Sequence, residues 1–117
     1  MRFQNTKKLI LTACLISSFT QMGYATEADG PALFEKKGCL TCHHLPGITN
    51  APPMMGPSLN GLNKKRWIVS GSMRNSEKNM RKWLKNPRAV KSTTLMPNLA
   101  LTDAEITTFI DYFETLN

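Results

Sequence analysis

The stretch GCLTCHH, residues 38–44, holds two thiols three positions apart and an imidazole directly after the second. Cys39 and Cys42 are separated by two residues, and His43 follows. This C-x-x-C-H spacing is typical of covalent attachment of a c-type haem. The two sulfurs add to the two vinyl groups of the porphyrin, which carries the next residue beneath the ring with a nitrogen at the iron. We therefore predict that Cys39 and Cys42 anchor one haem c and that His43 is the proximal iron ligand.

Three other chemistries could use the same side chains. A zinc site that included His43 and His44 would need two adjacent imidazoles in one tetrahedron, unlike the spaced ligand pairs of structural zinc sites. A thioredoxin-like dithiol occurs near a βαβ pattern, and the sequence has none. A plain disulfide between the two cysteines is the third alternative, because an exported protein meets an oxidising compartment. His44 itself is expected to be a solvated loop residue.

The first 25 residues are typical of a secretory signal peptide. A start with three Lys or Arg residues precedes a mostly apolar run over residues 9–19, and small residues end the segment. The apolar run is shorter than the about 20 residues that span a bilayer. We predict that residues 1–25 are removed and that residues 26–117 form one domain in the bacterial periplasm. Because LTAC, ending at Cys14, resembles a lipobox, a lipid anchor facing the periplasm is the alternative.

The remaining chain is short for a self-sufficient core. Removing 25 of the 117 residues leaves 92, and a domain of that size buries only somewhat more than about 60 per cent of its unfolded surface. A disulfide within the C-x-x-C pair would close too small a loop to contribute much. A large apolar cofactor could complete the core instead.

Three helices are expected. One has Asp29 or Gly30 as its N-cap and Pro31 near its first helical position, and it runs into Cys39. A second has Ser76 as its N-cap, a stretch with apolar residues at helical spacing, and a stop at the Asn-Pro pair that follows. The last follows the capping-box sequence TDAE, in which Thr and Glu stand three residues apart before an apolar face.

The rest of the chain predicts loops. Residues 45–63 contain four Pro, three Gly and no charged residue, which no regular element would tolerate. Because no segment alternates polar and apolar residues over five or more positions, no strand is expected. The predicted fold class is all-α, with three to five short helices around the haem.

The second axial position of the iron decides between electron transfer and ligand chemistry, and the candidates are methionines. Met96 lies in the irregular stretch after Pro87, where a side chain could reach the iron without breaking a helix. We predict Met96 as the distal ligand, with Met54 or Met55 as the rival. Two further methionines have simpler roles: Met73 precedes a helix, and Met80 lies on its apolar face.

Four motifs together resemble the class I c-type cytochromes of the small bacterial kind, over nearly the whole chain from Asp29 to Asn117. They are LFEKKGCLTCH (33–43), GPSLNGL (56–62), WLKNP (83–87) and LTDAEITTFIDYF (101–113). The resemblance implies the cytochrome c fold, in which the N- and C-terminal helices cross. It would set Gly30 and Phe34 against Phe109 and Tyr112.

The resemblance also implies roles around the haem. The Pro57 carbonyl would accept a hydrogen bond from the His43 ring. Trp83 and Leu84 would line the distal pocket, and Thr94 would lie near a haem propionate. Many relatives have Tyr near the Met sulfur where this chain has Trp83, and Ser-Thr replaces the familiar Pro-Gly segment before the Met. 

Trp67 has no counterpart in these motifs. A core position or a propionate contact through its indole N–H is expected for it.

Charge is unevenly distributed along the chain. Between Lys64 and Lys91 there are ten Lys or Arg residues and one acid, Glu77, whereas residues 102–117 hold four acids and no base. Removing residues 1–25 takes away three bases, so the net charge falls from +7 to +4. We expect the basic surface to steer redox protein partners with an acidic docking surface, the alternative being a solvated helix face. Nothing indicates nucleic-acid binding.

These features predict an electron-transfer protein rather than an enzyme, with no small-molecule substrate. Its haem iron would cycle between Fe(III) and Fe(II), taking an electron from a dehydrogenase or reductase and passing it to an acceptor such as a terminal oxidase. Two alternatives keep the haem: a dedicated haem subunit of a periplasmic oxidoreductase, or a small-ligand-binding protein if Met96 is not a stable ligand. A third has no haem and uses the thiols or a metal. Membrane contact is expected only through a partner complex or a lipidated Cys14.

Overall fold

The structure is a computed structural model that describes residues 29–47 and 55–117 of the 117-residue chain. The predicted signal peptide, Cys14 and Met54 lie outside the described residues. The elements are α1 (Asp29–Lys36), η1 (Cys39–Thr41), η2 (Leu62–Lys64), β1 (Trp67–Ile68), β2 (Met73–Arg74), α2 (Glu77–Lys85), α3 (Pro87–Val90) and α4 (Asp103–Glu114). Helix dominates the described chain, as predicted.

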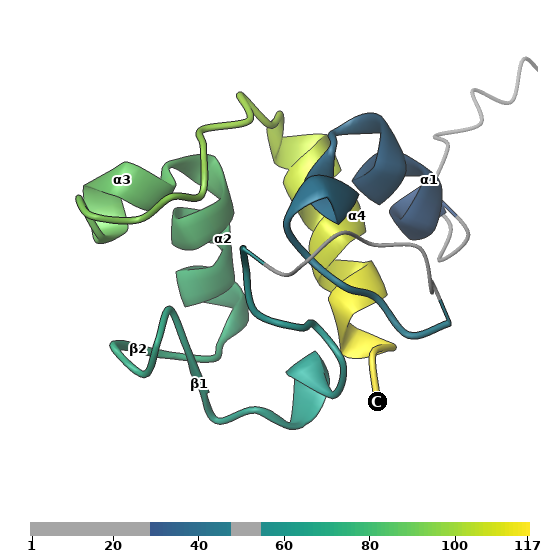
Figure 1. The fold of residues 1–117 in the computed structure, drawn as a ribbon, viewed down its shortest axis with the longest axis horizontal. Helices are drawn as coiled ribbons and strands as arrows, with labels where there is room; N and C mark the ends of the chain where they lie inside the picture. Colours follow the sequence, from purple (N-terminus) through teal and green to yellow (C-terminus); the bar gives the residue numbers. More distant parts are fainter. Residues whose placement is uncertain (1–28, 48–54) are drawn as a thin grey trace, which may run out of the picture.

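Helices α1 and α4, from the two ends of the described chain, pack against each other (Figure 1). A Cβ atom on Gly30 would lie 2.4 Å from Cβ of Tyr112, so only glycine allows this approach. Phe34 and Phe109 are both almost fully buried and meet edge to face, with 6.1 Å between ring centroids. The predicted crossing of the terminal helices is therefore confirmed.

Local capping signals set the helix ends. The Ser76 side chain accepts a hydrogen bond from the Asn79 amide at the start of α2, and both halves of the capping box between Thr102 and Glu105 are present at α4. Helix α1, however, ends at Lys36 and does not run into the cysteines as predicted. Gly38 stops it, because its φ of 73° is left-handed.

The sequence did not predict α3 or the β1–β2 hairpin. In α3, Asn86 caps the first turn by accepting from the Ala89 amide, and Pro87 stands near the start where its missing N–H costs nothing. Strands β1 and β2 pair antiparallel, with Ile68 opposite Met73. Each strand has two residues, too few to show the period of a strand.

Trp67 on β1 is 51% exposed, so the prediction of a core position for it is wrong. The guanidinium of Arg74, its partner across the hairpin, lies 5.4 Å from the centre of the indole ring. This distance is within the range of a cation–π interaction. The pair forms a basic and aromatic surface on the hairpin.

One apolar cluster joins the helices and the loops between them. It includes the predicted core residue Met80, which is 7% exposed. Its buried members are Phe34, Leu45, Leu59, Leu62, Met80, Leu84, Leu101, Ile106, Phe109, Ile110, Tyr112, Phe113 and Leu116. Most come from α4 and the segments that surround it, so α4 is the centre of the fold (Figure 1).

Ion pairs connect the start of α4 to two other parts of the chain. Glu105 pairs with Lys37 at 2.7 Å, and Asp103 pairs with Lys85 at 2.8 Å. Glu77 and Arg81 also form an ion pair within α2, at 2.8 Å. Within residues 29–47 and 55–117, none of the helices has the length and apolar character required to cross a bilayer.

Candidate haem-binding site

The two thiols and the imidazole lie on one tight turn. Within it, the amides of Cys42 and His43 both donate to the Cys39 carbonyl oxygen, at 3.1 and 2.9 Å. Both cysteines are half-buried free thiols, and Cys39 packs against the core. The turn thus presents two unpaired sulfurs and one imidazole from five consecutive residues, as the haem-attachment prediction requires.

Burial raises the pKa of the Cys39 thiol to about 11, and this effect outweighs the hydrogen bonding that lowers it. A redox-active dithiol depends on a lowered pKa, because the thiolate is the nucleophile. The environment of Cys39 therefore argues against the thioredoxin-like alternative. In the part of the chain that the structure describes, no three His, Cys, Asp or Glu side chains gather in a way that could hold a metal ion.

The predicted contact between His43 and Pro57 is present. Nδ1 of His43 donates to the Pro57 carbonyl oxygen at 2.8 Å. A carbonyl oxygen can only accept, so Nδ1 carries the proton and Nε2 keeps its lone pair. A metal-binding histidine commonly has its tautomer fixed in this way. Neutral imidazole with an available Nε2 fits the role of proximal iron ligand.

Gly56 forms a cradle for the same imidazole. A Cβ atom on Gly56 would lie 2.7 to 3.0 Å from three atoms of the His43 ring. Its amide donates to the Cys42 carbonyl oxygen at 2.9 Å, which ties the loop to the turn of the thiols. In the sequence, Gly56 carries no signal beyond its place at the start of GPSLNGL.

The rival ligand Met55 directly precedes Gly56 and is 68% exposed. It belongs to the loop that packs against His43, which is the proximal side of the predicted haem. This position favours Met96 over Met55 as the distal ligand. His44 is half-buried, and its carbonyl oxygen accepts from the Leu59 amide at 3.0 Å.

The predicted distal residues come from α2 and from the connection between α3 and α4. Leu84 is 5% exposed, while Trp83 and Met96 are half-buried and pack against the core. The hydroxyl oxygen of Thr94 accepts a hydrogen bond from the Met96 amide at 3.2 Å. Thr94 therefore holds the backbone at the predicted ligand, and its own hydroxyl hydrogen can still donate to a propionate.

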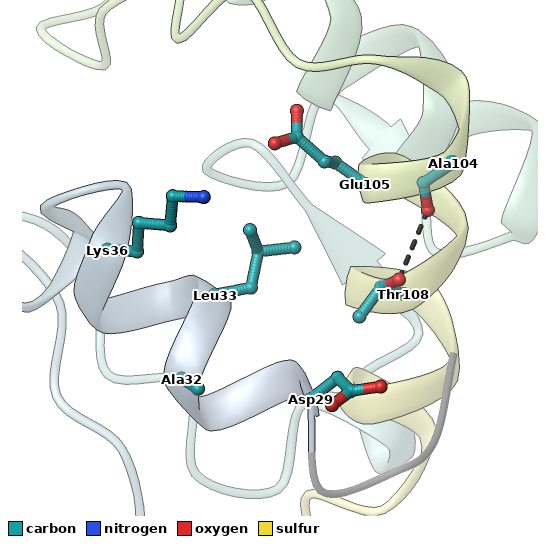
Figure 2. A pocket seen from close by; sticks show the side chains of 7 residues that line it. All are labelled: Asp29, Ala32, Leu33, Lys36, Ala104, Glu105 and Thr108. Atoms are coloured by element: carbon teal, nitrogen blue, oxygen red, sulfur yellow. Dashed lines mark hydrogen bonds between the residues drawn. The ribbon is translucent and has the colours of Figure 1, made fainter. Parts of the chain in front are cut away.

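A shallow pocket of about 330 Å³ lies elsewhere, between α1 and α4 (Figure 2). Thr108 on its wall donates to the Ala104 carbonyl oxygen at 3.2 Å, within the turn of α4. The lining residues are Asp29, Ala32, Leu33, Lys36, Ala104, Glu105 and Thr108. None of them is a predicted haem residue, so this pocket is distinct from the candidate site.

The residues present fit a covalent haem c: two free thiols, an imidazole with a fixed tautomer, a glycine cradle, and a half-buried methionine on a separate segment. The chain matches the family model described as cytochrome c over residues 27–117. It is also similar to cytochrome c oxidase subunit 2 of Alkalihalophilus pseudofirmus, with 24% identity over 89 residues. That alignment covers 75% of this chain and 25% of the relative, so the chain spans about a quarter of the relative's length. By its sequence and its helical fold, the chain belongs to the cytochrome c family, whose members bind haem c covalently and transfer electrons.

Proposed function

We propose that this protein is a periplasmic monohaem carrier that moves single electrons between a dehydrogenase or reductase and an acceptor such as a terminal oxidase. The hydrogen bond from His43 Nδ1 to the Pro57 carbonyl, at 2.8 Å, carries the proposal. It leaves Nε2 available beside the two thiols of the single C-x-x-C-H motif. That arrangement supports one haem with a permanent proximal ligand.

Four residues would hold the haem in this function. A bound haem c supplies the one-electron chemistry, because its iron is stable as Fe(III) and Fe(II). Cys39 and Cys42 would hold the haem covalently through thioether bonds and so prevent its loss. His43 and Met96 would be the two protein ligands of the iron and would leave no place for other ligands, and a methionine thioether would raise the reduction potential.

The charge distribution supports an acidic redox partner. Of the ten bases between Lys64 and Lys91, Arg81 and Lys85 pair with acids, while exposed bases on the hairpin and α2 make no ion pair within the described residues. A surface of one charge sign speeds association with an oppositely charged partner and makes the complex sensitive to salt. Brief complexes of this kind suit a carrier.

The first experiment is the visible and near-infrared spectrum of the oxidised protein, exported together with the haem-attachment machinery. We expect a weak sulfur-to-iron charge-transfer band that disappears in Met96→Ala and persists in Met55→Ala. Loss of the band in Met55→Ala alone would make Met55 the ligand. A protein with attached haem, no band, and carbon monoxide binding to the reduced form would instead support a small-ligand-binding function.

A second candidate function is a permanent haem subunit of a periplasmic oxidoreductase. It is favoured by the similarity to a protein named as a subunit of cytochrome c oxidase. Gel filtration of a native periplasmic extract separates the two proposals. A shuttle elutes at the size of the free domain, whereas a dedicated subunit co-elutes with a larger complex.

A further inference from the structure

Lys65 reaches the loop that holds the proximal imidazole. Its ammonium nitrogen donates to the Ser58 carbonyl oxygen at 2.8 Å. Ser58 directly follows Pro57, whose own carbonyl accepts the hydrogen bond from His43. Two successive carbonyl groups of one loop are therefore bound, one by the predicted iron ligand and the next by a lysine further along the chain, after η2.

The backbone of Lys65 is itself fixed. Its amide donates to the Leu62 carbonyl oxygen at 3.2 Å, which closes η2. The side-chain nitrogen Nδ2 of Asn75 donates to the carbonyl oxygen of Lys65 at 2.9 Å. The same nitrogen donates to the carbonyl oxygen of Leu62, also at 2.9 Å. The backbone N–H of Asn75 donates to the Arg66 carbonyl oxygen at 3.0 Å. The backbone of Lys65 is thus held in place directly before the hairpin, and its side chain extends from this fixed point.

The loop has other restraints, but they are of a different kind. The amides of Gly56 and Leu59 donate to carbonyl oxygens of the turn that bears the thiols, at 2.9 and 3.0 Å. These bonds tie the loop to the same turn that carries His43. Lys65 ties it to a separate part of the fold, and so limits how far the loop and the imidazole can move together.

We propose that Lys65 is a positioning residue for the proximal ligand: by holding the Ser58 carbonyl, it keeps the Pro57 carbonyl aligned with Nδ1 of His43. This inference rests on the proposed haem function of His43. The strength of the hydrogen bond at Nδ1 sets the basicity of the imidazole toward iron. A looser loop weakens that bond, lowers the basicity, and therefore raises the reduction potential.

Lys65→Met tests this, because methionine keeps the length of the side chain and removes the donor. Lys64→Met is the matched control: it removes the same charge one residue away, from an exposed lysine whose side chain makes no hydrogen bond or ion pair within the described residues. Lys65→Arg restores a cationic donor. All variants are compared as holoproteins, with haem attachment and the sulfur-to-iron band measured first.

The deciding readout is the solvent exchange rate of the His43 Nδ1 proton, followed by NMR in the reduced protein. We expect about tenfold faster exchange in Lys65→Met than in wild type, with wild-type behaviour in Lys64→Met and recovery in Lys65→Arg. The potential, measured at high ionic strength where exposed charges are screened, should rise in Lys65→Met alone. Equal exchange rates and equal potentials in the two Met variants would overturn the proposal. A wild-type protein without attached haem would instead overturn the proposed function.

Discussion

At the residue scale, the proximal side of the site depends on two groups that meet at one imidazole. Pro57 fixes the tautomer of His43 through its carbonyl oxygen, and Gly56 allows the loop to lie against the ring. The sequence alone predicted the cysteines, His43 and Pro57, because a short motif and a family resemblance contain them. It did not predict Gly56 or Lys65, because their roles are tertiary contacts within and around the loop that no motif or periodicity marks.

Replacing Gly56 with alanine should damage both stability and ligation. The new Cβ would overlap the His43 ring at 2.7 Å, and overpacking of this kind costs about 1–3 kcal/mol. We expect a lower urea midpoint for the holoprotein and shifted His43 resonances in its NMR spectrum.

Gly30→Ala is the control for that substitution. Its Cβ would overlap Tyr112 at 2.4 Å, so it should also lower the midpoint, yet leave the His43 resonances in place. A Gly56→Ala protein with wild-type stability and unchanged His43 signals would show that the loop does not press on the imidazole.

At the element scale, the helices that the sequence predicted are those with strong local end signals. Ser76 and the capping box at Thr102 mark their helices correctly. The four-residue α3 and the two-residue strands were missed because neither is long enough to show a period. The contact of the exposed Trp67 with its cross-strand partner Arg74 was also missed, because only the hairpin register reveals it.

The pairing of α4 with Lys37 makes stability depend on pH. The hydrogen bond from Lys37 is the main cause that lowers the pKa of Glu105 below its ordinary value of 4.5. A lowered folded-state pKa stabilises the protein above the unfolded-state value, and this contribution is lost as pH falls through the folded-state value. We expect the urea midpoint to fall below about pH 4.5 in wild type and to fall less in Glu105→Gln.

Glu114→Gln provides the comparison, because Glu114 is exposed on the same helix and its carboxylate makes no ion pair within the described residues. This variant should keep the wild-type pH profile. If Glu105→Gln also kept it, the ion pair with Lys37 would have no part in the acid sensitivity.

At the scale of the whole molecule, the chain separates its charges. The bases gather on the segments from η2 to α3, and the acids gather on α4, where Asp103 and Glu105 are already paired with lysines. Such a distribution orients the molecule in the field of a charged partner before contact. The orientation would depend on where a charge lies and not only on how many charges there are.

Charge reversal at two sites tests that dependence. Lys82→Glu on α2 and Lys36→Glu on α1 change the net charge equally. We expect Lys82→Glu to desorb from a carboxylate-terminated gold electrode at a lower salt concentration than Lys36→Glu, with slower electron transfer as measured by voltammetry. Equal behaviour of the two variants would mean that net charge alone governs the interaction.

Two contacts of the fold differ in how far apart along the chain the contacting residues lie. One is the turn from Cys39 to His43, and the other is the crossing of α1 with α4. The turn closes through bonds between residues three and four positions apart, whereas the crossing joins the first described helix to the last. Short loops close at little entropic cost, and distant contacts form late. We expect the turn with the two thiols to form while the rest of the chain is still unfolded. Haem attachment would then precede the packing of α1 against α4 and help to guide it.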